Sequence, residues 1–234
     1  MNFAEMLEAS RFNPRLWSNS ELKKIADQVL PGQRIINVAG WKDLDKQGRH
    51  YRDYFREPQC YHISNYAGDI KRGGVGGPNL TIDLSQELPC ELESMYDVAF
   101  NHTVLEHLED PRLAFLQIAK LSKDIVISVV PFKQKLHFEP GAFDDFFRLS
   151  PFAMRAFHKE AGLTVLYESY TPPPALDVYL LYVGSRKPEK HKNFPRAAID
   201  LNRLNFEIGN NKASSLAQNI CFRFVGKYFP RLIR

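Results

Sequence analysis

The chain has 234 residues, of which 44% are hydrophobic and 25% charged, and its formal net charge is +4. This length and composition predict one globular domain with extensions, large enough to bury a sizeable core. No apolar run approaches the ~18 residues of a membrane-spanning helix, and the first residues lack signal-peptide features, so we expect a cytoplasmic protein.

The charge is unevenly distributed along the chain. Residues 186–234 hold eleven Lys or Arg and three Asp or Glu, a net charge of +8, whereas the remaining residues carry −4. A basic tail favours contact with an anionic partner such as lipid headgroups or nucleic acid. The three cysteines, Cys60, Cys90 and Cys221, lack metal-ligand spacing, so we predict reduced packing residues and no metal site.

The first 30 residues are typical of two helices. Ser18-x-x-Glu21 is a capping box that predicts a helix start, and Pro31-Gly32 predicts its end. The helix that these signals enclose has one apolar face, made of Leu22, Ile25, Ala26 and Leu30.

Three short strands are expected next, at residues 34–41, 60–64 and 80–84. Between the last two, residues 71–78 read K-R-G-G-V-G-G-P. We reject a phosphate-binding loop there, because the G-K-[ST] ending is missing and no helix follows. This segment is therefore expected to be a flexible connection.

Residues 96–137 carry the clearest pattern in the chain. Two β-branched apolar runs, 98–100 and 125–130, are typical of strands buried on both faces. Asp110-Pro111 predicts a helix start between them, with Leu113, Leu116, Ala119 and Leu121 facing the sheet. Strand, helix and strand form a βαβ unit, and its ligands are expected at the carboxyl ends of the strands.

This pattern resembles the class I S-adenosylmethionine-dependent methyltransferases. The resemblance rests on D-V-x-x-N-x-x-x-L-E-H-x-x-D-P over residues 97–111, and on P-F at 131–132, His137, Pro140 and F-R-x-S-P at 147–151. It covers roughly residues 33–170 and is nearest the branch associated with surface-polysaccharide and lipopolysaccharide genes. It implies a Rossmann-like α/β fold, a seven-stranded mostly parallel sheet of order 3-2-1-4-5-7-6 with helices on both faces.

The resemblance also implies S-adenosylmethionine as cofactor and a set of residues to hold it. The family has an acid at position 37 and glycines at 39 and 41, where this chain has Asn37, Ala39 and Trp41, and only Gly40 remains. Position 65, where the family acid holds the ribose hydroxyls, is an asparagine. The full set implied is Asn37, Ala39, Gly40, Trp41, Arg52, Asn65, Asp83, Leu84, Asn101 and His102.

Two of these residues have a second interpretation. Arg52 pairs either with the cofactor carboxylate or with a neighbouring surface acid. Asp83 either contacts the adenine, as in the family, or is a solvated acid at a strand end.

The acceptor pocket is expected in the loop after Phe132. A hydroxyl acceptor needs a base, and histidine suits that task near neutral pH. We predict His137 as the base, Asp144 or Asp145 as its orienting acid, and His107 as the second choice of base. The alternative for His137 is a hydrogen-bonded loop histidine without a catalytic role.

The last part of the chain predicts a helix from Ser150-Pro151 to Gly162, a strand at 163–170 and an antiparallel strand at 176–183. A basic linker follows at 184–195, then helices at 197–208 and 214–229. The last helix is basic and amphipathic, which favours a membrane surface or a second subunit and disfavours nucleic acid. The chain thus divides into N-terminal helices (1–32), a methyltransferase-like domain (33–186) and a basic extension (187–234).

Two function classes follow from the sequence. The first is an O-methyltransferase acting on a sugar or other small hydroxyl acceptor, in a surface glycan or lipid-linked precursor. The second is a binding or scaffold protein that kept the fold and lost cofactor affinity, suggested by the residues at 37, 39, 41 and 65.

Overall fold

The computed structural model describes residues 13–74, 80–172 and 178–201. The chain divides into two units, one ending at Ile199 and one beginning at Asp200. All elements discussed below belong to the first unit. The expected first N-terminal helix before residue 13 and the helix at 214–229 lie outside the described residues.

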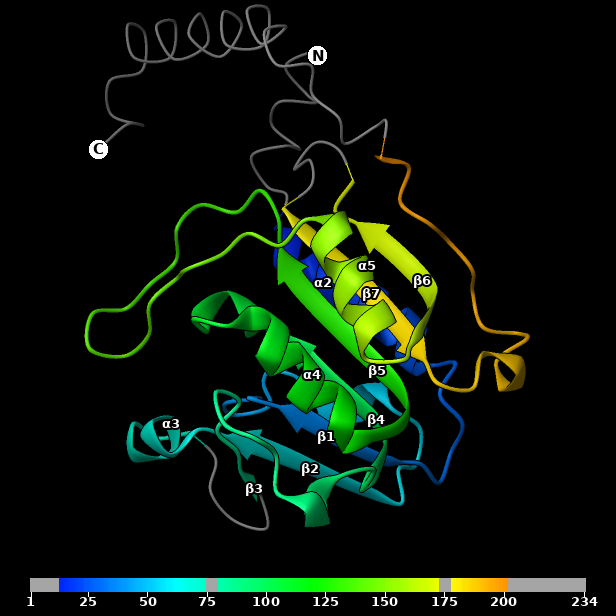
Figure 1. The fold of residues 1–234 in the computed structure, drawn as a ribbon, viewed down its shortest axis with the longest axis horizontal. Helices are drawn as coiled ribbons and strands as arrows, with labels where there is room; N and C mark the ends of the chain where they lie inside the picture. Colours follow the sequence, from blue (N-terminus) through cyan, green and yellow to red (C-terminus); the bar gives the residue numbers. More distant parts are fainter. Residues whose placement is uncertain (1–12, 75–79, 173–177, 202–234) are drawn as a thin grey trace, which may run out of the picture. The chain divides into compact units, whose positions relative to one another are not determined.

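One seven-stranded sheet organises this unit, in the order β3-β2-β1-β4-β5-β7-β6 (Figure 1). The first five strands in that order, from β3 to β5, pair with one another in parallel. The strand β7 runs antiparallel to both β5 and β6. The fold class and the strand order predicted from the sequence are therefore confirmed. The strands are β1 (Arg34–Val38), β2 (Cys60–Asn65), β3 (Leu80–Thr81), β4 (Tyr96–His102), β5 (Ser122–Pro131), β6 (Thr164–Tyr170) and β7 (Tyr179–Ser185).

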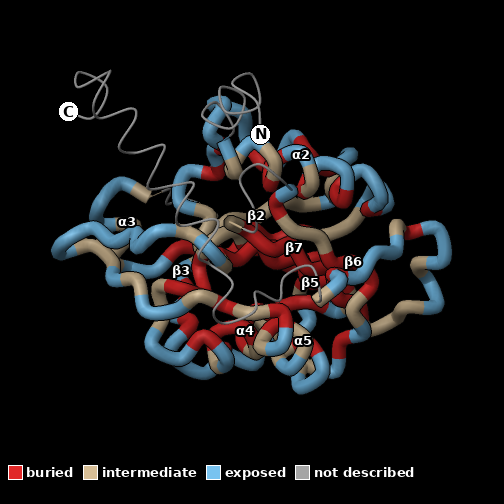
Figure 2. The backbone as a smooth tube through the Cα atoms, turned by 90° about the horizontal axis from the view of Figure 1, so that it is seen from above, coloured by how far each residue is buried: buried red, intermediate tan, exposed pale blue. Residues whose placement is uncertain are grey.

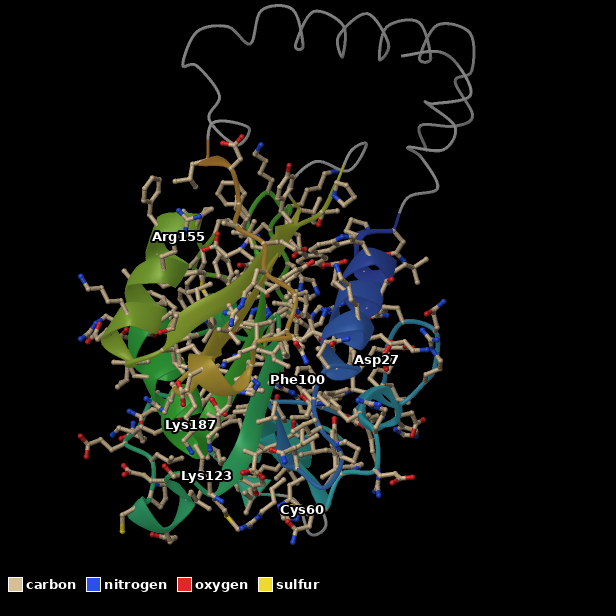
Figure 3. The ribbon with its side chains drawn as sticks, turned by 90° about the vertical axis from the view of Figure 1, so that its right-hand side faces the viewer. Asp27, Cys60, Phe100, Lys123, Arg155 and Lys187 are labelled. Atoms are coloured by element: carbon tan, nitrogen blue, oxygen red, sulfur yellow. The ribbon has the colours of Figure 1, made fainter. Side chains whose placement is uncertain are left out.

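Helices cover both faces of this sheet. Figure 2 shows α2 on one side and α4 and α5 on the other, with the buried strands between them. Seen from the side in Figure 3, Arg155 of α5 and Asp27 at the end of α2 lie in opposite outer layers, and Phe100 of β4 lies between them. The helices are α2 (Pro14–Ala26), α3 (Ala67–Lys71), α4 (Pro111–Leu121) and α5 (Pro151–Glu160), with 3-10 turns η1 (Tyr51–Tyr54), η2 (Cys90–Leu92), η3 (Leu105–His107) and η4 (Pro188–Lys190).

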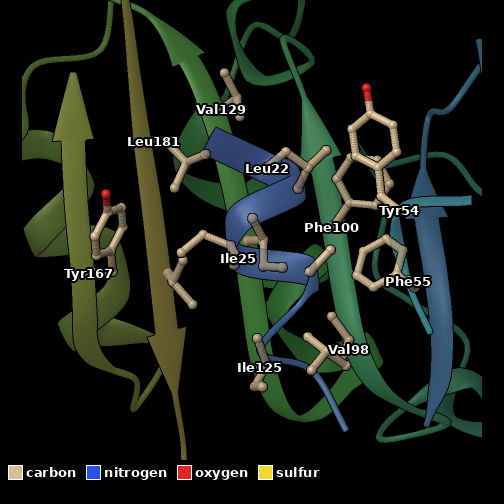
Figure 4. Close-up of a cluster of buried hydrophobic side chains, with 14 of the residues drawn as sticks. Leu22, Ile25, Tyr54, Phe55, Val98, Phe100, Ile125, Val129, Tyr167 and Leu181 are labelled. Carbon is tan, nitrogen blue, oxygen red and sulfur yellow. The ribbon is translucent and has the colours of Figure 1, made fainter. Parts of the chain in front are cut away.

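The core under α2 shows why the apolar runs became central strands. Val98 and Phe100 of β4 and Ile125 of β5 are almost fully buried, and Leu22 and Ile25 of α2 pack against them (Figure 4). Alternate residues of a strand point to opposite faces, so a strand covered on both sides must be apolar throughout. Removal of this apolar surface from water is the main stabilising contribution to the unit.

The predicted start of α2 is wrong. The helix begins at Pro14, and the Asn13 side chain accepts a hydrogen bond from the Arg15 amide, so that Asn13 is the cap. Ser18 lies inside the helix instead, and the helix ends at Ala26. Leu30, predicted on the buried face, is therefore past the helix end and is 67% exposed.

Both predicted caps of the later helices are confirmed. Asp110 accepts from the Leu113 amide at 2.9 Å, and Ser150 accepts from the Ala153 amide. Of the predicted buried face of α4, Ala119 and Leu121 are confirmed, whereas Leu113 and Leu116 are only half-buried. Phe115 is buried instead, and its ring packs on the His158 ring of α5, 4.7 Å between centroids.

The segment after β7 packs on the sheet where a linker was expected. Gly184 already belongs to β7, and the Arg186 guanidinium donates to the carbonyls of Ala119 and Ser122. Ala197, the expected start of a helix, forms a parallel bridge with Tyr167 of β6. Within the described residues, no helix has both the length and the apolarity to cross a membrane.

Candidate active site

The carboxyl ends of four parallel strands meet at one edge of the sheet. Val38 of β1 pairs with Asn101 of β4, and His102 of β4 pairs with Val129 of β5, so these strands end at one level. Asn65 is the last residue of the neighbouring β2. The structure therefore brings the predicted residues of positions 39–41, 65, 101 and 102 to the edge where open parallel sheets bind ligands.

The turn after β1 keeps backbone angles that usually require glycine. Ala39 and Trp41 have φ values of 52° and 51°, in the left-handed region that costs a residue with a Cβ about 1–2 kcal/mol. Gly40 between them does not have a positive φ. It is needed for space, since a Cβ there would lie 2.5 Å from the Asn37 side-chain nitrogen. The turn thus has left-handed backbone angles at two positions that hold residues other than glycine.

The predicted ribose-binding residue is bound to this turn. The Asn65 Oδ1 atom accepts from the Trp41 amide at 2.8 Å, and its Nδ2 atom donates to the Trp41 carbonyl at 2.9 Å. Two further amides of the turn are also engaged, Ala39 with the Ser64 hydroxyl and Gly40 with the Ser64 carbonyl. Asn65 therefore fixes the peptide of Trp41, whose indole is 40% exposed.

A buried carboxylate near the turn was missed by the sequence interpretation. Asp43 is 3% exposed and accepts hydrogen bonds from Asn37 Nδ2 at 2.7 Å and from the Tyr61 hydroxyl at 2.6 Å. Burial and this carboxylate raise the pKa of Tyr61 well above its ordinary value. Asp43 thus places a buried carboxyl group beside the side chain of Asn37. The two residues are six positions apart in the chain, and no spacing rule indicated the contact.

Arg52 and Asp83 lie at the surface. The Arg52 side chain is exposed, and only its backbone amide contacts the turn, by donating to Asp43 Oδ2 at 3.1 Å. The expected strand at 80–84 ends at Thr81, because Asp83 turns the chain by accepting from the amide and hydroxyl of Ser85. Leu84, the next residue, is buried.

Asn101 and His102 end β4 in different surroundings. Asn101 is completely buried, and neither its side-chain oxygen nor its nitrogen has a hydrogen-bond partner in the structure. His102 contacts the start of α2, where its ring bonds to the Arg15 guanidinium and to the Ser18 hydroxyl. Burial, and then the Arg15 charge, lower the pKa of His102 well below its ordinary value, so the ring is neutral near pH 7.

The predicted catalytic residues come together in residues 132–149, which we name the acceptor loop. Figure 1 shows it extending outward after β5 before it returns to α5. His137 is exposed, and its backbone amide donates to Asp145 Oδ2 at 2.6 Å. Asp145 is paired with Arg148, and the hydrogen bond from Arg148 lowers the pKa of Asp145. The carboxylate that positions His137 is therefore Asp145.

His107 packs against the base of the same loop. Its ring centroid lies 5.8 Å from that of His137, and its Nδ1 donates to the Asp144 carbonyl at 2.6 Å. Burial lowers the pKa of His107. Asp144 therefore takes part through its backbone, while its carboxylate is exposed.

The sequence places Glu106, next to His107, among the polar residues just past β4, but assigns it no role. Its side chain is 2% exposed, and one carboxyl oxygen has no hydrogen-bond partner. Burial raises the pKa of Glu106 to about 8, so its carboxyl group is mostly protonated at neutral pH. A perturbed acid next to a cavity is a frequent feature of functional sites. The L-E-H motif contains this residue, but only the fold reveals its burial.

A cavity of about 210 Å³ lies at this edge. It opens between the start of α2, the turns after β1 and β4, the acceptor loop and β7. Of the described residues, seven line it, namely Asn13, Arg15, Lys46, Thr103, Gln134, His137 and Tyr179. His137 is the predicted catalytic residue among them. No group of His, Cys, Asp and Glu in the described part of the chain has an arrangement that could hold a metal ion.

Comparison with known proteins supports the fold. No protein-family model and no curated protein matches the sequence. Among solved structures, a candidate zinc-dependent alcohol dehydrogenase from Rhodobacter sphaeroides is similar with a TM-score of 0.53 and 13% identity, over 76% of this chain and 97% of the other.

Two further structures have descriptions that name methyltransferases. A chain in the complex between the Haloferax volcanii Trm112 methyltransferase activator and a candidate methyltransferase has a TM-score of 0.50 and 14% identity, over 74% of this chain and 93% of that chain. A candidate methyltransferase from Bacillus halodurans has a TM-score of 0.51 and 9% identity, over 73% and 99%. At these identities the likeness concerns the fold. The predicted link to the surface-polysaccharide branch finds no support in these matches.

Proposed function

We propose that this protein is an S-adenosylmethionine-dependent methyltransferase that methylates a hydroxyl group of a sugar, in a surface glycan or a lipid-linked precursor. The observation that carries the proposal is the cavity lined by His137, which lies at the same sheet edge as the glycine-type turn after β1. The strand order shared with the methyltransferase structures supports it.

The residues at this edge fit the cofactor. The turn at Ala39 and Trp41 keeps the left-handed angles that allow a ligand to approach the backbone, and the exposed Trp41 ring offers a stacking surface for a base. Asp83 is an exposed acceptor for an exocyclic amine, and Asn101 has an unpartnered amide at the end of β4. The residues that would hold the cofactor are Ala39, Gly40, Trp41, Asp83 and Asn101. The bound cofactor would supply a methyl group that is electrophilic because it is attached to a sulfonium sulfur.

The protein's own contribution is to place the acceptor and to take its proton. A hydroxyl group of the acceptor in the cavity would give its proton to the His137 imidazole, while the bound cofactor would supply the methyl group that the hydroxyl oxygen takes up. Asp145 holds the backbone of His137 in place, and Arg148 holds Asp145. Most of the rate gain in such a displacement comes from positioning the two reactants.

The acceptor loop supports the lipid-linked form of the substrate. It exposes several large apolar side chains close to the cavity: Leu136, Phe138, Phe146 and Phe147. Apolar residues gathered on one exposed segment favour contact with another apolar surface. An acceptor with a lipid part would meet them as its sugar enters the cavity.

Calorimetric titration with S-adenosylhomocysteine tests the proposal. Micromolar binding by the full chain is expected, together with a roughly hundredfold loss of turnover in H137Q at unchanged cofactor affinity. H107Q serves as the comparison for the second-choice base, and a larger loss there than in H137Q would reverse the assignment.

A second candidate function is favoured by one observation. Both amide atoms of Asn65 and the three amides of residues 39–41 are bound within the protein. A turn closed in this way suits a scaffold or binding protein that kept the fold without the cofactor. The same titration separates the two functions, since a scaffold protein would give no binding heat.

A further inference from the structure

The cavity at the sheet edge is lined by cations and neutral donors. Arg15 and Lys46 are the basic residues of the lining besides His137, and none of the described residues that line it is an Asp or Glu. A cavity with a local charge of this sign favours an anionic ligand. The contacts of the two cations show whether their charges are available.

Arg15 is held by neutral partners. Its guanidinium bonds to the His102 ring and to the Thr103 hydroxyl, and neither group carries a negative charge. Among the described residues, Glu106 interacts with Arg15 electrostatically, and Glu106 is mostly protonated at neutral pH. Hydrogen bonds thus fix the Arg15 guanidinium in position, and no described residue forms an ion pair with it.

Lys46 is available for the same ligand. Its side chain is exposed and forms no hydrogen bond or ion pair with the described residues. The neighbouring Asp45 does not neutralise it, because the Asp45 carboxylate is bound to Arg49 and to the Tyr54 hydroxyl at 2.6 Å. The segment 45–49 therefore uses its acid internally and leaves Lys46 at the cavity.

Neutral donors and a helix start complete the lining. Tyr179, Gln134 and Asn13 can each donate a hydrogen bond from a hydroxyl or amide group, whereas the Thr103 hydroxyl already donates to the His102 carbonyl. The 13-residue helix α2 begins at the cavity wall, and its amino-terminal end favours negative charge. Two cations with several neutral donors suit a phosphate group, which has more acceptor oxygens and more charge than a carboxylate.

We propose that this cavity binds a phosphate group carried by the acceptor, so that the substrate class is a phosphorylated, hydroxyl-bearing compound. That the ligand is a methyl acceptor rests on the proposed function. That the cavity binds an anion rests on the lining residues alone. The volume of about 210 Å³ exceeds what a phosphate group fills, since a water molecule takes about 30 Å³. Room remains for the part of the acceptor that reaches His137.

Titration of the full chain with glucose 6-phosphate and with glucose tests the site at low ionic strength, by calorimetry and phosphorus NMR. The phosphorylated sugar is expected to bind at least tenfold more tightly than glucose. R15Q is expected to raise its Kd about tenfold and K46Q about threefold. Lys23 lies on the same helix as Arg15, is exposed and is far from the cavity lining, so K23Q is the matched control and should leave the Kd unchanged.

K46Q decides the question even where R15Q fails to fold, because the exposed Lys46 side chain makes no hydrogen bond or ion pair with the part of the chain that the structure describes. Equal weakening in K46Q and K23Q would assign the binding to diffuse surface charge and overturn the proposal, as would absence of binding to the unaltered protein.

A second arm separates the acceptor from the cofactor, whose own carboxylate is also an anion. The Kd for glucose 6-phosphate is expected to stay within twofold in saturating S-adenosylhomocysteine. Competition between the two would assign the cavity to the cofactor carboxylate and overturn the proposal. If S-adenosylhomocysteine does not bind at all, the proposed function fails, while the phosphate titration still decides the anion site.

Discussion

The side chain of Asn65 and the peptide of Trp41 form a reciprocal pair, in which the amide of each donates to the oxygen of the other at 2.8 and 2.9 Å. This pair joins the end of β2 to the turn after β1. It also occupies the position at which the methyltransferase family has an acid. The state of the candidate cofactor site therefore depends on this one contact.

Asn65 variants are expected to separate stability from binding. N65A removes both hydrogen bonds and should lower the free energy of unfolding by about 1–2 kcal/mol, measured by urea denaturation. N65D keeps the acceptor, loses the donor and places a charge beside the Trp41 carbonyl. On the proposed function it should open the turn and tighten S-adenosylhomocysteine binding roughly tenfold. Equal affinities in N65A and N65D would contradict this role of position 65.

Adjacent substitutions in the turn are expected to have opposite effects. A39G relieves the strain that the left-handed φ angle places on Ala39, but glycine also gives the unfolded chain more conformational entropy. The net effect should be a gain of about 0.5–1 kcal/mol in the free energy of unfolding. G40A puts a Cβ 2.5 Å from the Asn37 side chain and should destabilise it by about 1–3 kcal/mol. Thermal and urea unfolding of both variants measure the contrast. Destabilisation by A39G would show that the strain is not stored in this turn.

Glu106 is expected to make the folded protein less stable as the pH rises. Its pKa is about 8 in the fold against 4.5 for an ordinary glutamate, so unfolding releases a proton between these values. The free energy of unfolding therefore falls by about 1.4 kcal/mol per pH unit across that window, through this group alone.

E106Q removes that titration and tests the prediction. Its stability relative to the unaltered protein should grow with pH between about 5 and 8, and urea unfolding at several pH values measures the slope. E160Q is a control, because Glu160 forms an exposed ion pair with Arg112. A slope in E106Q equal to that of the control would mean that Glu106 is ionised in the fold.

The two neighbouring acids of the acceptor loop are expected to differ. D145N loses the charge that binds the His137 amide and the Arg148 guanidinium, so kcat should fall about tenfold or more. D144N should lose less, because Asp144 contributes its backbone carbonyl to His107. Initial-rate kinetics of both variants provide the measurement, and equal losses would contradict the assignment of the orienting acid to Asp145.

The fold was predictable because its signals are local. The run at 125–130 could only be a strand covered on both faces, and Asp110-Pro111 and Ser150-Pro151 carry both a cap and a proline suited to a first helical turn. The start of α2 was harder, since Asn13-Pro14 and Ser18-x-x-Glu21 both satisfy the cap rules. The contact of Ser18 with His102, 84 residues away, decided between them.

The site was predictable only as far as it follows the strand ends. Positions 39–41, 65 and 101 follow directly from the topology. Asp43 and Glu106 did not, because their importance comes from burial, which depends on the packing of the whole unit. The cavity was also beyond reach, since Arg15, Lys46 and Tyr179 come from three distant segments.

The positive φ angles of Ala39 and Trp41 show that a backbone conformation typical of glycine can occur in a turn without glycine at those positions. Glycine patterns identify such turns because glycine adopts positive φ angles at the lowest energetic cost. A ligand that binds at such a turn, however, contacts the main chain. Once neighbouring side chains hold such a turn, here through Asn65 and Asn37, residues other than glycine can occupy its positions while the path of the main chain stays the same. A search for turns of this kind can therefore use backbone torsion angles where the sequence lacks glycine.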